Sequence, residues 1–227
     1  MIRANLVTLV TGVVAVALAG LVRFVLPYEQ DITSLWGFLV KLTPQLAAIV
    51  AIAWLDVETA RRLRLHLIAL PALFLGFLLY FVPATFMAAM DIEDGSGTFE
   101  DLYLHVVVFV PFFIVALLLA YRIGGGSREG VLRTGLAMSI LHVSGLEDLV
   151  AVSMNRRLSA IPEVWTWADH ITVRLGHPAT KTEAYVFIIV HVVAALLVLF
   201  VPLRRLRRTA AAGAGEIPAG EGKQAPR

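Results

Sequence analysis

Long apolar runs, separated by short polar segments, extend along almost the whole chain. A helix needs about 20 predominantly apolar residues to cross roughly 30 Å of hydrocarbon, and six runs reach that length. The predicted spans cover residues 5–27, 34–55, 65–90, 102–122, 131–154 and 183–203. Segments this apolar favour packing as one bundle. We therefore predict an all-α, polytopic membrane domain of six transmembrane helices over residues 1–203.

Two segments outside these runs are different in character. The connection 155–182 contains Trp165 and Trp167 in the stretch "SAIPEVWTWADHITVRLG". It predicts either a short helix lying on the membrane surface or a loop packed on the bundle. Residues 204–227 shift to Ala, Gly, Pro and charged residues, so we expect a disordered tail there.

The first span also carries a processing pattern. Residues 17–19 read Ala-Leu-Ala, which fits the small-residue cleavage site of a signal peptide. The apolar run nevertheless continues to Pro27 and the basic residue before it is Arg3 alone, so we expect the span to be retained.

Basic residues set the expected orientation, because Lys and Arg collect at cytoplasmic ends. Those that follow spans 2, 4 and 6 are Arg61, Arg62, Arg64, Arg122, Arg128, Arg133, Arg204, Arg205, Arg207 and Arg208. The opposite loops "YEQD" and "DIEDGSGTFED" contain neither Lys nor Arg. We predict a multi-pass protein of the cell membrane with both termini in the cytoplasm. The connection 155–182 is an exception, since it places Arg156, Arg157, Arg174 and Lys181 on the outer side.

Composition agrees with this class of protein and narrows its chemistry. The chain is 59% hydrophobic and 16% charged, with a mean hydropathy of +0.81. It has no cysteine, which excludes disulfides and thiolate catalysis. The net charge of +2 gives little support for nucleic acid binding. The expected partners are the lipid bilayer, a hydrophobic small molecule and another membrane protein; no motif identifies a cofactor.

Apart from His66 and the arginines at the inner ends, ionisable residues inside the predicted spans fall in their middle or outer halves. They are Arg23, Lys41, His105, His142, Glu147, Asp148 and His191. Each charge in hydrocarbon costs about 2.5–3.5 kcal/mol, so such residues usually face a polar interior. We predict a pocket open to the outer side, in which Arg23 and Lys41 pair with the two acids. The alternatives are cations that extend to the interface, histidines that only pack, and acids in structural ion pairs.

The adjacent acids raise a question about the fifth span. Ser144-Gly145-Leu146-Glu147 fits a capping box, which would begin a new helix and break the span at Ser144-Gly145. In a continuous helix, Glu147 and Asp148 would point about 100° apart, so one small site could not receive both. We favour the continuous helix because the motif is short. The same pattern predicts helix caps at Thr180–Glu183 and Thr98–Asp101.

Metal binding has weak support. Asp101 and His105 are four residues apart and would share a helix face. The chain has none of the H-x-x-x-H, H-E-x-x-H or EF-hand patterns. We therefore predict no metal site and keep these two residues as the weak candidates.

The first functional hypothesis is an enzyme that uses acid–base chemistry on a lipid or isoprenoid-like substrate. A carboxyl in an apolar pocket can donate a proton, and a second carboxylate or a histidine can accept one. The predicted catalytic residues are Glu147, Asp148, His142 and His191. The predicted substrate-binding residues are Arg23, Lys41, His105, Trp165 and Trp167.

Two alternatives stay open. Acidic, basic and histidine side chains in mid-membrane also form proton relays, which fits a small proton- or ion-coupled transporter. No internal repeat is visible, and the inner halves of the spans lack polar residues. A non-catalytic membrane subunit or lipid-binding protein would use the same charges as structural ion pairs.

Overall fold

The computed structural model describes residues 5–25, 34–82, 84–85, 87, 91, 95, 99–154 and 160–201, without the side chains of residues 23–24, 66 and 99–107. These residues are mostly helical, and the strands among them are two short ones of two residues each. The predicted all-α class is therefore confirmed. The predicted tail 204–227 lies outside the described residues.

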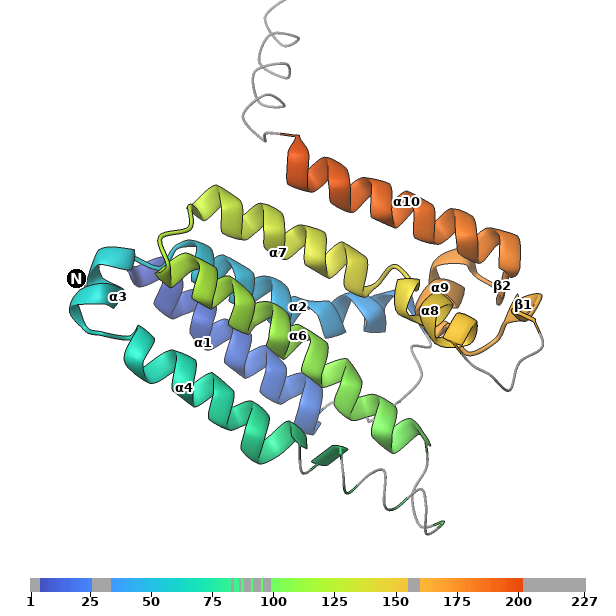
Figure 1. Cartoon of the computed structure of the whole chain (residues 1–227), viewed down its shortest axis with the longest axis horizontal. Helices are drawn as coiled ribbons and strands as arrows, with labels where there is room; N and C mark the ends of the chain where they lie inside the picture. The colour runs from blue at the N-terminus through green and yellow to red at the C-terminus, as the bar shows by residue number, and fades with distance from the viewer. Residues whose placement is uncertain are drawn as a thin grey trace, which may run out of the picture.

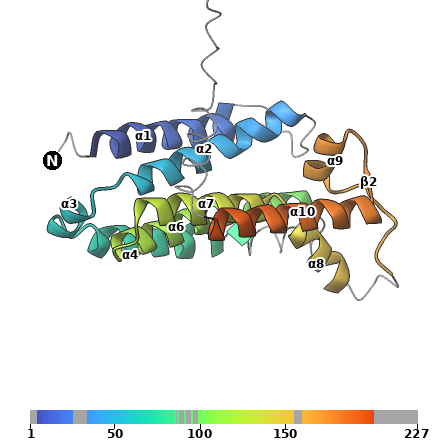
Figure 2. The ribbon, with the colours of Figure 1, turned by 90° about the horizontal axis from the view of Figure 1, so that it is seen from above.

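Five long helices run along the long axis of the molecule (Figure 1). They are α1 (Leu6–Gly20), α2 (Leu35–Ala53), α6 (Phe99–Ile123), α7 (Arg128–His142) and α10 (Lys181–Phe200). Viewed from above, α1 and α2 form one layer, and α6, α7 and α10 lie in a second layer (Figure 2). Helix α2 also packs on α6 and α7, so it joins the two layers.

Shorter elements complete the chain. The π-helical turn η2 (Leu21–Val25) extends α1. Helix α3 (Val57–Arg62) leads to α4 (His66–Gly76), which continues in the π-helical turn η3 (Phe77–Phe81). Beyond α7 lie α8 (Leu146–Met154), β1 (Val164–Trp165), α9 (Asp169–Leu175) and β2 (Ala179–Thr180). These last four elements gather at the end of the molecule opposite α3 (Figure 1).

Two helices of the described part, α2 and α10, are long and apolar enough to cross a membrane. The pair α7 and α8 qualifies as a third crossing if the two are counted as one bent span. Helix α1 and the segments Leu67–Phe81 and Val108–Ile123 are apolar but shorter. The structure thus agrees with a membrane protein, and the six-span topology stays a prediction.

The described side chains form two separate hydrophobic cores. The bundle core joins α2, α6 and α7 and consists of Ile49, Ile52, Ala53, Ile114, Leu118 and Val131. The end core joins the β1–β2 pair, α9 and the start of α10 and consists of Trp165, Ala168, Ile171, Ala179, Ala184 and Ile188. Leu149 and Val152 pack α8 against this second core. The sequence between α7 and α8 therefore passes from one core to the other.

The fifth predicted span is broken, so our preference for a continuous helix was wrong. Helix α7 ends at His142, α8 begins at Leu146, and their axes differ by 47°. Gly145 has a φ of +77°, which a residue with a side chain rarely adopts. The hydroxyl of the fully buried Ser144 donates to the Leu141 carbonyl at 2.7 Å and accepts from the Leu146 amide at 3.1 Å. A capping box would require the Ser144 hydroxyl to accept from the amide of Glu147. It accepts instead from the amide of Leu146, one residue earlier.

The connection after α8 packs on the bundle through the end core. Strands β1 and β2 pair antiparallel, with Val164 opposite Thr180 and Trp165 opposite Ala179. Helix α9 between them has a fully buried Ile171. The predicted capping box at the start of α10 is confirmed, because the Thr180 hydroxyl and the Glu183 carboxylate each accept from the other's backbone amide. Thr98 lies outside the described residues.

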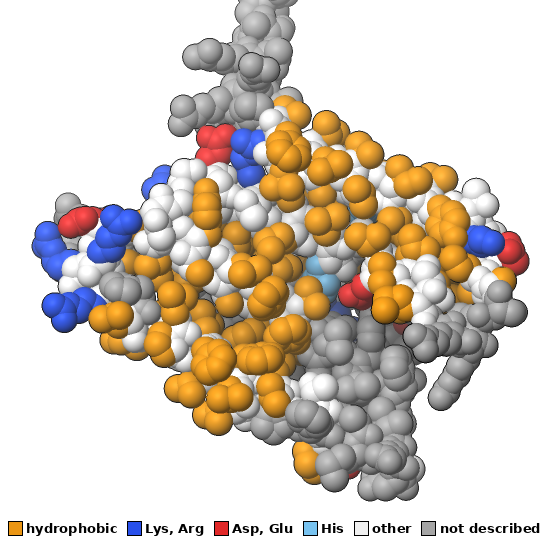
Figure 3. All heavy atoms as spheres, in the orientation of Figure 1, with side chains coloured by type: hydrophobic (Ala, Val, Ile, Leu, Met, Phe, Trp, Pro, Cys, Tyr) orange, Lys and Arg blue, Asp and Glu red, His pale blue; other side chains and the backbone are white. Residues whose placement is uncertain are grey.

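Basic side chains gather at the α3 end of the molecule, away from α8 and α9 (Figure 3). Arg61, Arg62 and Arg64 are exposed there. Arg122 of α6 donates to the Leu55 carbonyl at 2.7 Å, which ties α6 to the end of α2. The arginines expected on the cytoplasmic side after spans 2 and 4 therefore share one end. The orientation in a membrane stays a prediction.

Candidate functional site

Ionisable side chains from four helices meet around the bend between α7 and α8. The bend places a glycine and a small serine where α9 packs closely: a Cβ added to Gly145 would lie 2.8 Å from Cδ1 of Ile171 and 3.4 Å from Nε2 of His170. The residues of this cluster, which we call the bend site, are His142, Glu147, Asp148, His170, Arg174 and His191. On the face drawn in Figure 3, a histidine and an acidic side chain lie next to each other near the middle.

Asp148 and His170 face each other across the bend site. Oδ2 of Asp148 lies 3.5 Å from Nε2 of His170, and each side chain is 13% exposed. This separation is longer than a well-formed hydrogen bond, and within the described part of the chain neither atom has a hydrogen-bond partner. The Trp167 indole donates a hydrogen bond to the Asp148 carboxylate. The pair is thus oriented, while two buried polar atoms are left for a proton, a water molecule or a ligand group.

Arg174 of α9 joins the elements that surround the bend. Its Nη2 donates to the Val143 carbonyl at 2.6 Å, and its Nε donates to the His170 carbonyl at 2.6 Å. The guanidinium also lies over the rings of Phe38 and Phe187, 4.5 and 4.6 Å from their centroids. Helices α2, α7, α9 and α10 therefore all contact this one side chain.

The hydrogen bonds of His191 define its tautomer. Nδ1 lies 2.8 Å from the Phe187 carbonyl, which can only accept, so Nδ1 carries the hydrogen. Nε2 lies 2.9 Å from Nη1 of Arg174, which can only donate, so Nε2 has a free lone pair. His191 also stacks on the Phe187 ring, with a centroid distance of 4.1 Å. In this arrangement His191 is neutral.

Burial alters the acid–base behaviour of His170 and Arg174 on α9. It lowers the pKa of His170 to about 4, helped by the positive charge of Arg174. Burial also lowers the pKa of Arg174 to about 10, so this residue keeps its charge at neutral pH. At pH 7 the bend site therefore has a neutral His170 beside a charged Arg174.

The predicted catalytic residues lie in the same region but in different environments. Glu147 is exposed on α8, whereas Asp148 is turned toward α9. The two acids thus diverge, as their adjacency on a helix requires. His142 is the last residue of α7, and its buried Nδ1 has no hydrogen-bond partner among the described residues. His191 lies about two helical turns beyond the buried Ala184 of α10 and contacts Arg174.

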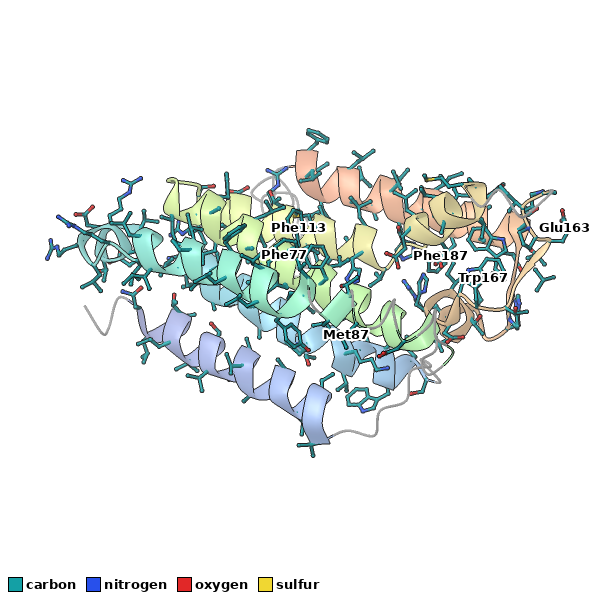
Figure 4. The ribbon with its side chains drawn as sticks, turned by 60° about the horizontal axis from the view of Figure 1, so that its bottom comes forward. Phe77, Met87, Phe113, Glu163, Trp167 and Phe187 are labelled. Carbon is teal, nitrogen blue, oxygen red and sulfur yellow. The ribbon has the colours of Figure 1, made fainter. Side chains whose placement is uncertain are left out.

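The predicted substrate-binding residues are dispersed. Lys41 is exposed on α2. Trp165 is fully buried in the end core, where it stacks on Trp167 at 5.5 Å, and Trp167 is 42% exposed. Trp167 and Phe187 lie at the same end of the molecule, and Glu163 lies further out at its tip (Figure 4). The side chains of Arg23, His105 and the weak metal candidate Asp101 lie outside the described residues.

Sequence reasoning missed His170 and Arg174 as members of the site. Both belong to the connection that we assigned to an outer loop. One weak signal was available, because the connection carries Arg174 and three other basic residues on the side where we expected few. Its hydrogen bonds to Val143 and His191 explain why this loop carries an arginine.

No metal centre is formed by the described side chains. Among them, no three His, Asp or Glu residues group closely enough to hold a metal ion. The chemistry that the bend site offers is the transfer of a proton between a carboxyl and an imidazole. Comparisons with protein-family models, curated proteins and solved structures gave no match.

Proposed function

We propose that this protein is a membrane-embedded enzyme that carries out acid–base chemistry on a lipid or isoprenoid-like substrate at the bend site. Asp148 and His170 exchange the proton with the substrate. His142 and Glu147 line the same region, and Arg174 and His191 hold its frame. The site is built into the six-span cell-membrane topology predicted from the sequence, with the bend on the outer side and both termini in the cytoplasm.

The facing pair of Asp148 and His170 carries this proposal. The carboxyl of Asp148 and the imidazole of His170 face each other at 3.5 Å, are both largely buried, and lack hydrogen-bond partners at the facing atoms among the described residues, so they form an acid–base pair. A hydrophobic substrate is consistent with the exposed apolar side chains of Val150 and Met154, which follow Asp148 on the same helix α8.

The test begins in a native-host strain that lacks this protein. Mass spectrometry of total lipid extracts identifies hydrophobic compounds that accumulate or disappear. The wild-type chain is expected to restore the profile, whereas Asp148→Asn and His170→Gln do not, although both reach the membrane in normal amounts. A positioned acid or base contributes about 10²–10⁴-fold to a rate, so the loss should be near complete.

Glu163→Gln is the matched control. Glu163 is an exposed acid of the same connection that pairs with Lys181 at 3.2 Å, away from the bend site. This variant is expected to restore the lipid profile as the wild type does. An Asp148→Asn protein that restores the profile equally well would refute the acid–base role and favour the non-catalytic subunit or lipid-binding protein.

Transport is the second candidate, favoured by the bend itself. A helix broken inside a membrane exposes backbone groups and an ion-binding end, as in many transporters. The purified protein in vesicles that contain a pH-sensitive dye distinguishes the two. A carrier moves protons across the vesicle membrane and loses this flux in Asp148→Asn, whereas an enzyme gives no flux in either form.

A further inference from the structure

The carbonyl of Val143 lies in the bend, directly after the last residue of α7. Helix α7 ends at His142, so this carbonyl has left the regular pattern of the helix. Nη2 of Arg174 donates to it at 2.6 Å. The bent form of the chain is therefore stabilised from outside, by a side chain of α9.

The same guanidinium depends on His191 for its position. Nη1 of Arg174 lies 2.9 Å from Nε2 of His191, and this contact is a hydrogen bond only while Nε2 has a lone pair. Since Nδ1 already carries a hydrogen toward the Phe187 carbonyl, a second proton on the ring must go to Nε2. Protonation would convert the contact into two donors and two positive charges that face each other.

Such a contact repels in a partly buried site, where solvent screens charges poorly. Arg174 then has to withdraw from His191. Because its Nη2 belongs to the same rigid group as its Nη1, withdrawal also removes the donor from the Val143 carbonyl. Protonation of His191 on α10 therefore removes a hydrogen bond that stabilises the bend between α7 and α8.

We propose that His191 is a proton-sensitive switch that acts through Arg174 on the bend between α7 and α8. Neutral His191 holds the bent form, and protonated His191 releases it. Release moves α8, and with it Asp148, relative to His170. That the switch regulates catalysis by Asp148 and His170 rests on the proposed function. The pH-dependent change of the bend is independent of that function.

The elements near the bend and the start of α10 itself carry other titratable groups. They are His142 of α7, Glu147 and Asp148 of α8, Asp169, His170 and Arg174 of α9, and Lys181 and Glu183 at the start of α10. His170 lies one helical turn before Arg174 on α9, so a proton on its ring would also face the guanidinium. A variant of His191 is therefore needed to separate its proton from those of its neighbours.

The chain has no cysteine, so a pair of introduced cysteines can be spin-labelled without other changes. Leu136 of α7 and Val150 of α8 are exposed at 44% and 48% and lie on opposite sides of the bend. Pulsed electron paramagnetic resonance on the full-length purified protein measures the distance between the labels at pH 8 and pH 5. The wild-type background is expected to shift from one distance at pH 8 to a second at pH 5.

His191→Gln is the decisive variant, because the glutamine oxygen can accept from Arg174 but takes up no proton in this range. It should keep the pH 8 distance at both pH values. His177→Gln removes an exposed histidine of the connection before α10, and its label distance should shift with pH as in the wild type. A wild-type distance that does not change, or a His191→Gln distance that changes as in the wild type, overturns the switch.

Arg174→Gln gives a second test if His191→Gln does not fold. It should show the released distance already at pH 8, and the wild-type distance there would refute the linkage. Asp148→Asn separates the switch from the proposed function. If the wild-type distance shifts with pH but Asp148→Asn still restores the lipid profile, the proposed function is refuted and the switch is not. If Asp148→Asn loses the lipid profile but the wild-type distance does not shift, the switch is refuted and the proposed function is not.

Discussion

Gly145 and Ile171 are in direct contact at the bend: a Cβ on the glycine would lie 2.8 Å from Cδ1 of the isoleucine. The contact brings α9 against the broken span and thereby brings His170 to Asp148. It has two requirements, a residue without a side chain and a backbone with φ of +77°. Both are met by glycine alone.

Gly145→Ala is therefore expected to destabilise the protein by about 1–3 kcal/mol, because it adds a clash to an unfavourable left-handed backbone. The free energy of unfolding can be measured by SDS titration in mixed micelles. Gly20→Ala is the control, since a Cβ there meets nothing within 4 Å at the end of α1. It should be neutral or slightly stabilising, and equal losses in both variants would contradict the role of the bend.

Acid is expected to weaken the fold through His170. Its pKa in the folded protein is about 4, below the ordinary value of 6.5. Below pH 6.5 the unfolded chain therefore binds a proton that the folded chain does not. Stability is present in full above that pH and is lost as the pH falls from 6.5 to 4, by at most about 3 kcal/mol.

The measurement is the unfolding free energy as a function of pH. His170→Gln should flatten the dependence between pH 6.5 and 4, because the glutamine has no proton to gain. His177, 54% exposed, supplies the control, and His177→Gln should keep the wild-type slope. An unchanged slope in His170→Gln would mean that other groups cause the acid sensitivity.

Gln45 and Ser139 offer a test of the contact between α2 and α7. Nε2 of Gln45 donates to Oγ of Ser139 at 2.8 Å, and both residues are 5% exposed. Removing either partner leaves a buried polar group, so Gln45→Leu and Ser139→Ala should each cost about 1–3 kcal/mol. The double variant should cost less than their sum. Strict additivity would show that the two side chains do not interact.

The capping box of α10 predicts a smaller effect. Thr180→Ala removes the hydroxyl that accepts from the Glu183 amide and should cost about 0.5–2 kcal/mol. Thr182→Ala, an exposed change within the same turn, should stay within about 0.5 kcal/mol of the wild type. Thermal unfolding in detergent gives both values, and equal effects would contradict the capping role.

The length of the apolar runs and the capping patterns predicted the helices well where the local sequence determines the structure. The predicted spans 34–55 and 183–203 correspond to α2 and α10, and the Thr180–Glu183 cap was read correctly. The break at Ser144-Gly145 was visible as an option, yet we favoured the wrong form. The choice depends on α9 packing against Gly145, which is a tertiary contact that no local pattern contains.

The candidate site was also predicted where local patterns are informative and missed where tertiary contacts decide. Asp148, His142 and His191 were singled out because charge and histidine are unusual in apolar helices. Their expected cationic partners were Arg23 and Lys41, whereas the partner that the structure gives Asp148 is His170 of the connection. A residue in a loop has no periodicity that reveals its direction, so only the folded chain places His170 and Arg174.

The presence of two hydrophobic cores has a consequence for how the molecule can open. His142 ends a helix of the bundle core, while His170 and Arg174 lie on α9, a helix of the end core. The bend site therefore lies on a seam between two packing units rather than inside either. Partial unfolding of the end core alone would expose the Asp148–His170 pair to exchange with solvent, with the bundle core still intact.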